Sequence, residues 1–293
     1  MKDLKSNVKD IALVLEGGGM RNSYSAGILN VLLEKEIYFN YVIGISAGAV
    51  HAANYLLRDR ERIKRNFVDV VRDENVGGIQ SLLKGKGYFN SEYLYTEFEP
   101  TKEKKDNYHR FFENEAEITI GAFDADHGEM KYFTKEDIKT VDDLKLITRA
   151  SCSLPLLMKE TVIDGITYYD GGVGRPIPIR KAIEDGYEKF FVVLTRPQGY
   201  RKEAPTKNLI IKNTLGQHPK LVEAILTRHN RYNEDLDLLE KLKAEGKAYI
   251  VYAEDQSVEN TEMDLHKLQD NYELGYFQGL NQYKEYLDFV GLK

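Results

Sequence analysis

The 293-residue chain contains only one cysteine, Cys152, so no disulfide bond can form within it. The same scarcity excludes a structural zinc site built from several cysteines, and it is typical of proteins in a reducing compartment. No apolar run approaches the roughly twenty residues that a membrane-spanning helix needs. The apolar run nearest the N-terminus, Ile11–Leu15, is shorter than the core of a signal peptide. These absences predict a cytoplasmic protein without a membrane span.

The sequence also lacks an excess of positive charge, because 47 acidic residues outnumber 41 basic ones and the net charge is −6. Nucleic acids are bound through a positive field, so we expect no nucleic-acid partner. The segment from Arg196 to Lys220 departs from this balance, since Glu203 is its only acidic residue and the local charge is about +5. Peripheral contact with a membrane therefore stays open as an alternative.

Hydrophobic residues make up 42% of the chain, which excludes wholesale disorder. Short apolar runs alternate with helical patterns such as Asn22–Glu36 and Ala47 to about Arg58. This alternation predicts an α/β fold, a mostly parallel sheet covered on both faces. The expected strands are Ile11–Leu15, Tyr41–Ile45, Glu117–Phe123, Lys131–Thr134, Thr161–Tyr169, Phe190–Thr195 and Ala248–Ala253.

Two long helical patterns, Lys220–Gly246 and Thr261–Phe289, follow the basic segment. They predict a catalytic-type α/β domain over residues 8–196 and a mainly helical C-terminal extension over residues 197–293 that packs on it. The segment Val76–Pro100 is rich in glycine and aromatic residues. It is either a mobile aromatic flap or, as is more common for such loops, a surface excursion packed on the sheet.

One motif that carries chemistry is Gly44-Ile45-Ser46-Ala47-Gly48, a GxSxG sequence between a predicted strand and a predicted helix. Such a tight turn exposes the serine hydroxyl, and small neighbours relieve the crowding. The N-terminus of the next helix supplies unpaired N–H groups and a partial positive charge. We therefore interpret Ser46 as a candidate nucleophile, with a turn that has no chemistry as the alternative.

A second motif, Glu16-Gly17-Gly18-Gly19-Met20-Arg21, follows the first predicted strand. Three glycines let the backbone point N–H groups into one concavity, which can hold a phosphate or an oxyanion. Dinucleotide binding is less well supported, because Asn22 occupies the position of that fingerprint's last glycine. Arg21 either orients the loop or is a surface charge.

A serine nucleophile needs a proton acceptor. None of the six histidines lies in a pattern that marks a base, and His51 is about 140° around its helix from Ser46. Asp170 is the better candidate, since it ends a predicted strand and is followed by Gly171 and Gly172. The carboxyl ends of parallel strands meet at one edge of a sheet, so Asp170, Ser46 and the glycine-rich loop could lie together.

The glycine-rich loop, the GxSxG motif and the Asp-Gly-Gly motif, in this order, resemble the patatin-like phospholipase family. The segment Arg149–Pro155 resembles the family's helix-to-loop segment before the aspartate, and the resemblance extends from about Ile11 to Thr195. The remainder resembles the C-terminal extension of a bacterial branch of the family. The resemblance implies a three-layer α/β/α sandwich and hydrolysis of acyl esters by a Ser–Asp dyad, with no cofactor and no metal.

Carried over to this sequence, the resemblance makes Ser46 the nucleophile and Asp170 its base. The oxyanion hole would be formed by the backbone amides of Gly17, Gly18, Gly19 and Met20. The supporting residues of the motifs would be Arg21, Gly44, Gly48, Gly171 and Gly172. The sequence departs from the family pattern at Asn22, where the family has glycine, and at Gly174-Arg175-Pro176.

The substrate class implied by the resemblance is a lipid or other acyl ester, which includes phospholipids, lysophospholipids and neutral glycerolipids. Cys152 lies close to the Asp-Gly-Gly motif, and we expect it to be a packed residue and not a second nucleophile. Two alternatives stay open. One is an α/β-hydrolase with a histidine triad, and the other is a non-catalytic module that binds a lipid or a nucleotide.

Overall fold

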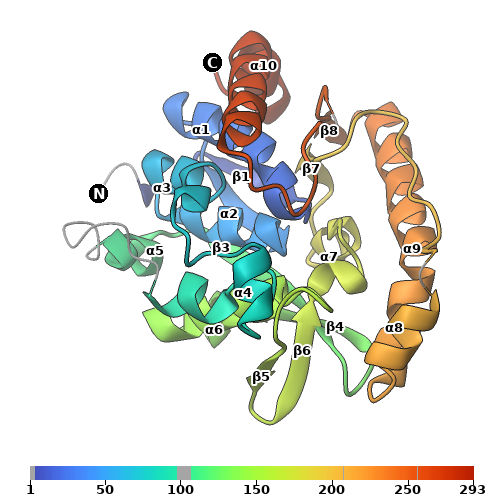
Figure 1. Ribbon diagram of the computed structural model, residues 1–293. Helices are drawn as coiled ribbons and strands as arrows, with labels where there is room; N and C mark the ends of the chain where they lie inside the picture. Colours follow the sequence, from blue (N-terminus) through green and yellow to red (C-terminus); the bar gives the residue numbers. More distant parts are fainter. Residues whose placement is uncertain (1–3, 98–106, 207, 256) are drawn as a thin grey trace.

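A computed structural model describes residues 4–97, 107–206, 208–255 and 257–293 of the chain (Figure 1). An eight-stranded sheet runs through the described residues in the order β5-β6-β3-β2-β1-β7-β8, with β4 paired to β3. The strands are β1 (Val8–Leu15), β2 (Phe39–Ile45), β3 (Glu117–Asp124), β4 (Glu129–Thr134), β5 (Thr161–Ile163), β6 (Ile166–Asp170), β7 (Lys189–Val193) and β8 (Ala248–Val251). From β3 to β8 neighbouring strands are parallel, whereas β4, β5 and β6 add antiparallel pairs.

Helices cover both faces of this sheet. They are α1 (Asn22–Glu34), α2 (Ala47–Leu56), α3 (Arg60–Arg65), α4 (Ile79–Leu83), α5 (His109–Glu113), α6 (Val141–Cys152), α7 (Ile179–Glu184), α8 (Asn208–Thr214), α9 (Pro219–Ala244) and α10 (Leu265–Val290). Short helical turns lie at Gly19–Arg21, Asp69–Arg72, Tyr93–Glu97, Lys135–Asp137 and Gly171–Val173.

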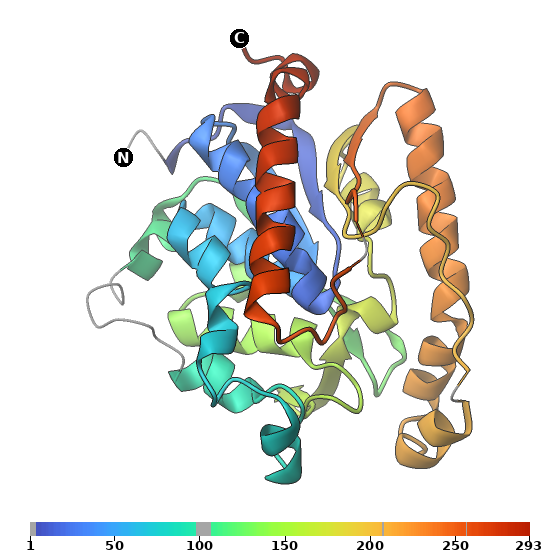
Figure 2. The ribbon, with the colours of Figure 1, turned by 45° about the horizontal axis from the view of Figure 1, so that its top comes forward.

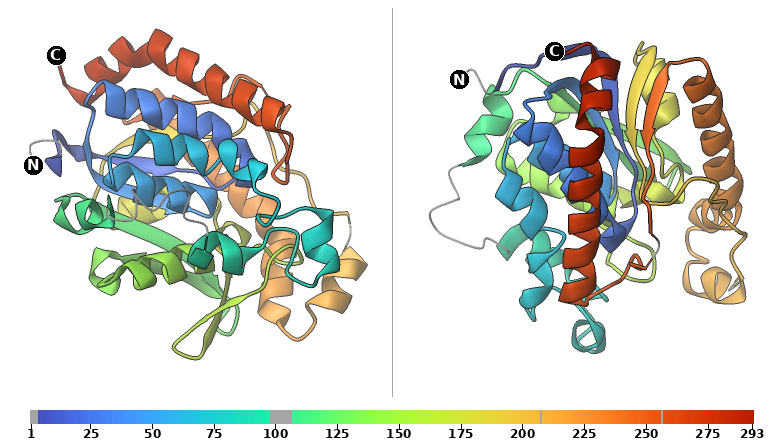
Figure 3. Two further views of the ribbon diagram at one scale, coloured as in Figure 1. Left: turned by 60° about the vertical axis from the view of Figure 1, so that its left-hand side comes forward. Right: turned by 90° about the horizontal axis from the view of Figure 1, so that it is seen from above.

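The two faces of the sheet build separate hydrophobic clusters, because successive side chains of a strand point to opposite sides. In β1, Leu13 and Leu15 pack with residues of α1, α2, α6 and α10, whereas Ala12 and Val14 pack with residues of α7 and α9. In the right-hand view of Figure 3 the sheet separates α10 from α9. The expected three-layer α/β/α fold with a mostly parallel sheet is therefore confirmed.

The structure corrects one predicted strand. Thr161–Tyr169 is not continuous but forms a hairpin, with β5 and β6 joined by a turn at Asp164 and Gly165. Both turn residues have positive φ, 51° and 81°, a conformation that aspartate tolerates and glycine favours. The antiparallel hairpin ends at Asp170, which pairs with Ala122 near the C-terminal end of β3.

The C-terminal part is mainly helical, as expected, but it also takes part in the sheet through β8. Its last helix, α10, lies along α1 (Figure 2). The two helices approach so closely that a Cβ on Gly27 would lie 2.3 Å from the Tyr272 carbonyl oxygen, and one on Gly275 would lie 2.2 Å from that of Tyr24. The domain boundary between residues 196 and 197 stays a prediction. No helix among the described residues is both long and apolar enough to cross a membrane.

Candidate active site

Ser46 occupies a sharp turn between β2 and α2. Its backbone has φ 55° and ψ −127°, a strained conformation for a residue other than glycine. A Cβ on Gly44 would lie 2.2 Å from the carbonyl oxygen of Gly48, and one on Gly48 would lie 2.5 Å from that of Leu15. Only glycine therefore fits at positions 44 and 48, two residues before and two residues after Ser46. The chain makes the tight strand-to-helix turn that the GxSxG motif predicts.

The strained turn is also held by Ser151, which the sequence analysis did not single out. The backbone N–H of Ser46 donates a hydrogen bond to Ser151 Oγ (2.9 Å), and this hydroxyl donates to the carbonyl oxygen of Gly121 (2.6 Å). Ser151 lies at the end of α6, within the Arg149–Pro155 segment. That segment was the signal that could have identified it.

Asp170 lies at the end of β6 and contacts Ser46 directly. Ser46 Oγ donates to Asp170 Oδ2 (2.5 Å), and the N–H of Gly172 donates to Asp170 Oδ1 (2.7 Å). The backbone N–H of Asp170 donates a hydrogen bond to the carbonyl oxygen of Ser153 (2.9 Å). A Cβ on Gly171 would lie 2.3 Å from the Gly121 carbonyl oxygen, so this glycine lets β6 approach β3.

Burial changes the acidity of Asp170, whose exposed fraction is only 2%. Loss of hydration raises the pKa of its carboxyl to about 6, while the Ser46 hydrogen bond, the charge of Arg228 and the Gly172 N–H oppose this rise. A carboxylate with this pKa is still ionised at neutral pH, and it is a stronger base than an exposed aspartate.

The histidines do not form an alternative triad with Ser46. His51 is fully buried beside the Phe67 ring, with Nε2 2.8 Å from the Asn22 carbonyl oxygen. Burial lowers the pKa of His51 to about 3, so it is a neutral, packed side chain. Among the described residues, no histidine lines the pocket that contains Ser46.

The glycine-rich loop lies against the Ser46 turn, since a Cβ on Gly17 would lie 3.1 Å from Ser46 Cβ. Two of the four N–H groups predicted to bind the oxyanion already donate to carbonyl oxygens, which corrects the prediction for these two. The N–H of Gly17 donates to the carbonyl oxygen of Pro176 (3.0 Å), and the N–H of Met20 donates to that of Asn260 (3.0 Å). Because a backbone N–H has only one proton to donate, the amides of Gly18 and Gly19 are the candidates that remain.

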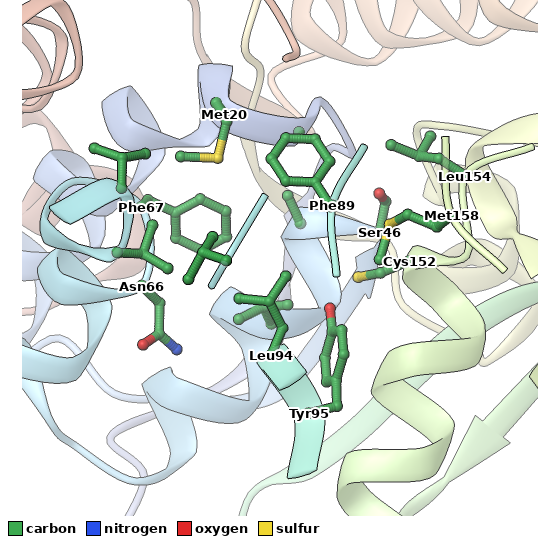
Figure 4. Close-up of a pocket in the computed structure, with 16 residues that line it drawn as sticks. Met20, Ser46, Asn66, Phe67, Phe89, Leu94, Tyr95, Cys152, Leu154 and Met158 are labelled. Atoms are coloured by element: carbon green, nitrogen blue, oxygen red, sulfur yellow. The ribbon is translucent and has the colours of Figure 1, made fainter. Parts of the chain in front are cut away.

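An apolar cavity of about 120 Å³ opens beside Ser46 (Figure 4). Val76, Phe89, Leu94 and Tyr95 of the aromatic segment 76–100 line it, so this part of the segment packs beside the site. Residues 98–100 of that segment lie outside the described part. The cavity is lined by Gly19, Met20, Ser46, Ala47, Val50, Asn66, Phe67, Val70, Val71, Val76, Phe89, Leu94, Tyr95, Cys152, Leu154 and Met158.

Cys152 lies beside Ser46 in this cavity and is 7% exposed (Figure 4). Burial, and then the negative charge of Asp170, raise the pKa of its thiol well above the usual range. The thiol is therefore protonated at neutral pH and is a poor nucleophile, in line with the packed role expected for it. No cluster of three or more metal-ligating side chains is found in the described part of the chain.

Most of the chain matches two protein-family models. Residues 13–183 match the family model of patatin-like phospholipases, and residues 218–291 match a domain of unknown function (DUF6363). Uncharacterized protein YjjU of Escherichia coli (strain K12) is 27% identical over 202 residues, which are 64% of this chain and 52% of YjjU. Probable lipid hydrolase 463L of Invertebrate iridescent virus 6 is 29% identical over 188 residues, 59% of this chain and 63% of that protein.

Both alignments thus span less than two thirds of the relatives' own length. Among solved structures, the crystal structure of VipD from Legionella pneumophila is similar with a TM-score of 0.51 and 12% identity. The superposition covers 94% of this chain and 67% of VipD, and at this identity it supports the fold alone. Because the family model covers more than half of the chain, including both motifs around Ser46 and Asp170, the chain belongs to the patatin-like phospholipase family.

Proposed function

We propose that this protein hydrolyses acyl esters of lipids, with Ser46 as the nucleophile and Asp170 as its base. The observation that carries the proposal is the 2.5 Å hydrogen bond from Ser46 Oγ to Asp170 Oδ2 at the side of an apolar cavity. A buried carboxylate with a pKa of about 6 can accept the serine proton, and the cavity suits an acyl chain. The match to a family of lipid hydrolases supports the same reaction.

The reaction has two steps. Ser46 Oγ attacks the ester carbonyl carbon while Asp170 Oδ2 takes its proton, and the carbonyl oxygen becomes an oxyanion. When the tetrahedral intermediate collapses, Asp170 returns the proton to the leaving alcohol and the acyl group stays on Ser46. Water then gives up a proton to Asp170 and attacks the acyl-enzyme. When this second tetrahedral intermediate collapses, Asp170 returns the proton to Ser46 Oγ, the fatty acid leaves, and both residues regain their starting forms.

The oxyanion would be stabilised by the N–H groups of Gly18 and Gly19, together with the N-terminus of α2. Gly19 lines the same cavity as Ser46, which supports this assignment. Each well-placed donor of this kind contributes about 3 kcal/mol to lowering the barrier. Because two loop amides remain as candidate donors, the loss of either should lower kcat strongly.

The test is hydrolysis of a short-chain nitrophenyl ester and labelling by a fluorophosphonate probe, followed by a panel of lipids assayed for released fatty acid. Ser46→Ala should abolish both turnover and labelling. Cys152→Ala is the matched control, because Cys152 lines the same cavity but is not the nucleophile, and it should still be labelled. Labelling that persists in Ser46→Ala would refute the assignment.

A further inference from the structure

One basic side chain of the C-terminal part, Arg228, lies beside the proposed base. It belongs to α9, within the residues 218–291 that match a domain of unknown function. A Cβ on Gly172 would lie 2.8 Å from Asp170 Oδ1 and 3.1 Å from Arg228 Nη2. Because both atoms adjoin this one point, they lie within about 6 Å of each other, the range over which an opposite charge favours an ionised carboxylate.

The contacts of α9 hold Arg228 in this place. Arg228 lies one turn before Tyr232, which is buried, so it shares the helix face that packs against the rest of the protein. Three residues further on, Arg231 Nε donates a hydrogen bond to the carbonyl oxygen of Gly174 (2.7 Å). This bond ties α9 to the turn that follows Asp170, so the guanidinium and the carboxylate are held by connected parts of the structure.

The Asp170 carboxylate needs a compensating charge, because it is buried and its two hydrogen bonds come from an uncharged hydroxyl and an uncharged backbone N–H. Two titratable groups face it from other elements, the thiol of Cys152 on α6 and the hydroxyl of Tyr95. Burial raises the pKa of both groups, so both are neutral at neutral pH. Among the described residues, the cation whose charge acts on Asp170 is Arg228.

Arg228 itself has no better partner than Asp170. Its Nε is buried and has no hydrogen-bond acceptor among the described residues. Asp170 acts on it more strongly than Glu16 does, and the Glu16 oxygens already accept from Thr195 and from the Tyr232 hydroxyl. The other titratable groups that face Arg228 are Tyr200, Tyr232, Arg21, Lys202 and Arg231. A desolvated guanidinium near other cations is unfavourable unless a carboxylate offsets its charge, and Asp170 is that carboxylate.

We propose that the C-terminal region completes the active site, with Arg228 as a positioning residue that holds the Asp170 carboxylate in its ionised form. This proposal rests on the ester hydrolysis proposed above, because only an ionised Asp170 can take the proton of Ser46. Arg228 does not line the cavity, so it acts through Asp170 and not on the substrate. The same region also contacts the glycine-rich loop, since the Asn260 carbonyl oxygen accepts from the Met20 N–H.

The proposal predicts a change in pH dependence. Without the charge of Arg228 the ionised carboxylate is less favoured, so the pKa of Asp170 rises above its value of about 6. An increase to about 7 would lower kcat about eightfold at pH 5.5, where few Asp170 side chains are then ionised. At pH 8.5 kcat would change little, because Asp170 is ionised in either case. A purely structural role for Arg228 would lower kcat equally at both pH values.

The first test is the pH–rate profile of Arg228→Met with a short-chain nitrophenyl ester, read at the isosbestic wavelength of the nitrophenol. Methionine removes the charge but keeps much of the side chain's volume, and the midpoint of kcat should move from about 6 to about 7. Arg228→Lys keeps the charge and should keep the midpoint near 6. Lys220→Gln is the matched control, since it removes one charge from an exposed position on the same helix. An unchanged midpoint in Arg228→Met, or an equal shift in Lys220→Gln, would overturn the proposal.

The second test needs no turnover. A carbon NMR titration follows the Asp170 carboxyl, whose signal is assigned by its absence from Asp170→Asn, and its midpoint should also rise in Arg228→Met. Failure of the wild type to hydrolyse esters or to react with a fluorophosphonate would refute the hydrolase, whereas a raised NMR midpoint would still support the action of Arg228 on Asp170. A carboxyl that titrates at the same pH with and without Arg228 would overturn the proposal.

Should Arg228→Met fail to fold, as judged by circular dichroism, Arg228→Gln replaces it, because glutamine removes the same charge and leaves a polar side chain. The same rise is expected in the midpoint of the pH–rate profile and of the NMR titration. An Arg228→Gln protein with both midpoints at the wild-type pH would overturn the proposal.

Discussion

The turn around Ser46 and the glycine-rich loop both follow a parallel strand, but different parts of the chain hold them in place. The turn is held by Gly44, Gly48 and Ser151, all within the region that matches the family model. The loop is held in part by Asn260, from the C-terminal part, which occupies the N–H of Met20. The position of the proposed nucleophile therefore depends on the family-matched region, whereas the number of loop N–H groups left for the proposed oxyanion hole also depends on the C-terminal part.

The largest effect on catalysis is expected at Asp170, which accepts the hydrogen bond from Ser46. Asp170→Asn removes the proposed base, so kcat should fall about 10³-fold, within the range for loss of a general base. In the wild type, kcat should rise with pH through a midpoint of about 6, because Asp170 must be ionised to accept the proton. A pH–rate profile checks both, and a profile that is flat between pH 5 and 7 would contradict the role of Asp170.

The stability of the same Asp170→Asn variant shows whether a loss of activity comes from misfolding. The folded-state pKa of Asp170 is raised from 3.8 to about 6, so ionisation of this group costs about 3 kcal/mol of stability. This cost sets in as the pH rises from about 4 to about 6, and an asparagine does not carry it. The variant should therefore be more stable than the wild type at pH 8 and equally stable below pH 4, as measured by urea unfolding.

The turn itself is tested by Gly48→Ala, which should destabilise the protein by about 3 kcal/mol. The added Cβ would lie 2.5 Å from the Leu15 carbonyl oxygen, and the two backbone segments cannot move apart without displacing β1 or α2. Gly279→Ala is the control, since Gly279 lies in α10 and the three atoms nearest to its added Cβ would be side-chain atoms of Val31, at 3.0 Å or more, and not backbone atoms. Equal urea midpoints for the two variants would show that the turn is not as tightly packed as described.

The loop is tested by Gly19→Ala, for which we expect a loss of about 2 kcal/mol and a lower kcat. Gly19 has φ 56°, and its Cβ would lie 2.3 Å from the Asn260 carbonyl oxygen. Gly246→Ala isolates the backbone cost, because Gly246 has φ 70° and no neighbour within 4 Å. If Gly19→Ala were no more costly than Gly246→Ala, the C-terminal contact would not hold the loop.

The smallest effect is expected for Ser151→Ala, which leaves the Ser46 N–H without its acceptor. We expect a loss of about 1.5 kcal/mol in the free energy of unfolding, together with a fall in kcat. Ser153→Ala is a useful comparison, because that buried hydroxyl bonds Arg149 and Thr161 and not Ser46. A similar loss of stability with a smaller fall in kcat is expected there, and an equal fall in kcat would argue against a specific role for Ser151.

Much of the fold could be predicted from local sequence. Buried strands are short apolar runs, and the glycines and helical patterns between them mark strand–turn–helix units. The missed hairpin is instructive, because Asp164-Gly165 is a recognised turn signal that lay inside an apolar run. The family likewise followed from three short motifs. Four of their glycines leave no room for a side chain, because a Cβ would lie 2.2 to 2.5 Å from a backbone oxygen at Gly19, Gly44, Gly48 and Gly171.

Long-range contacts were not predictable in this way. Whether the N–H groups of Gly17 and Met20 are free depends on Pro176 and Asn260, which are far away in the sequence. Arg228 lies on a long helix among other charged residues, and nothing in the local pattern distinguishes it from a solvated one. The aromatic segment similarly lines the cavity because it packs with Met20 and with Leu268 of α10.

The sequence by itself determined which residues could form a nucleophile, a base and an anion-binding loop, because these depend on residue type and on position next to a strand end. Only the tertiary structure decided which backbone amides remain unpaired, how strongly Asp170 is desolvated, and which cations surround the loop. These properties arise from hydrogen bonds and burial between segments distant in the chain, and hydrogen bonding and desolvation act through space and not along the sequence.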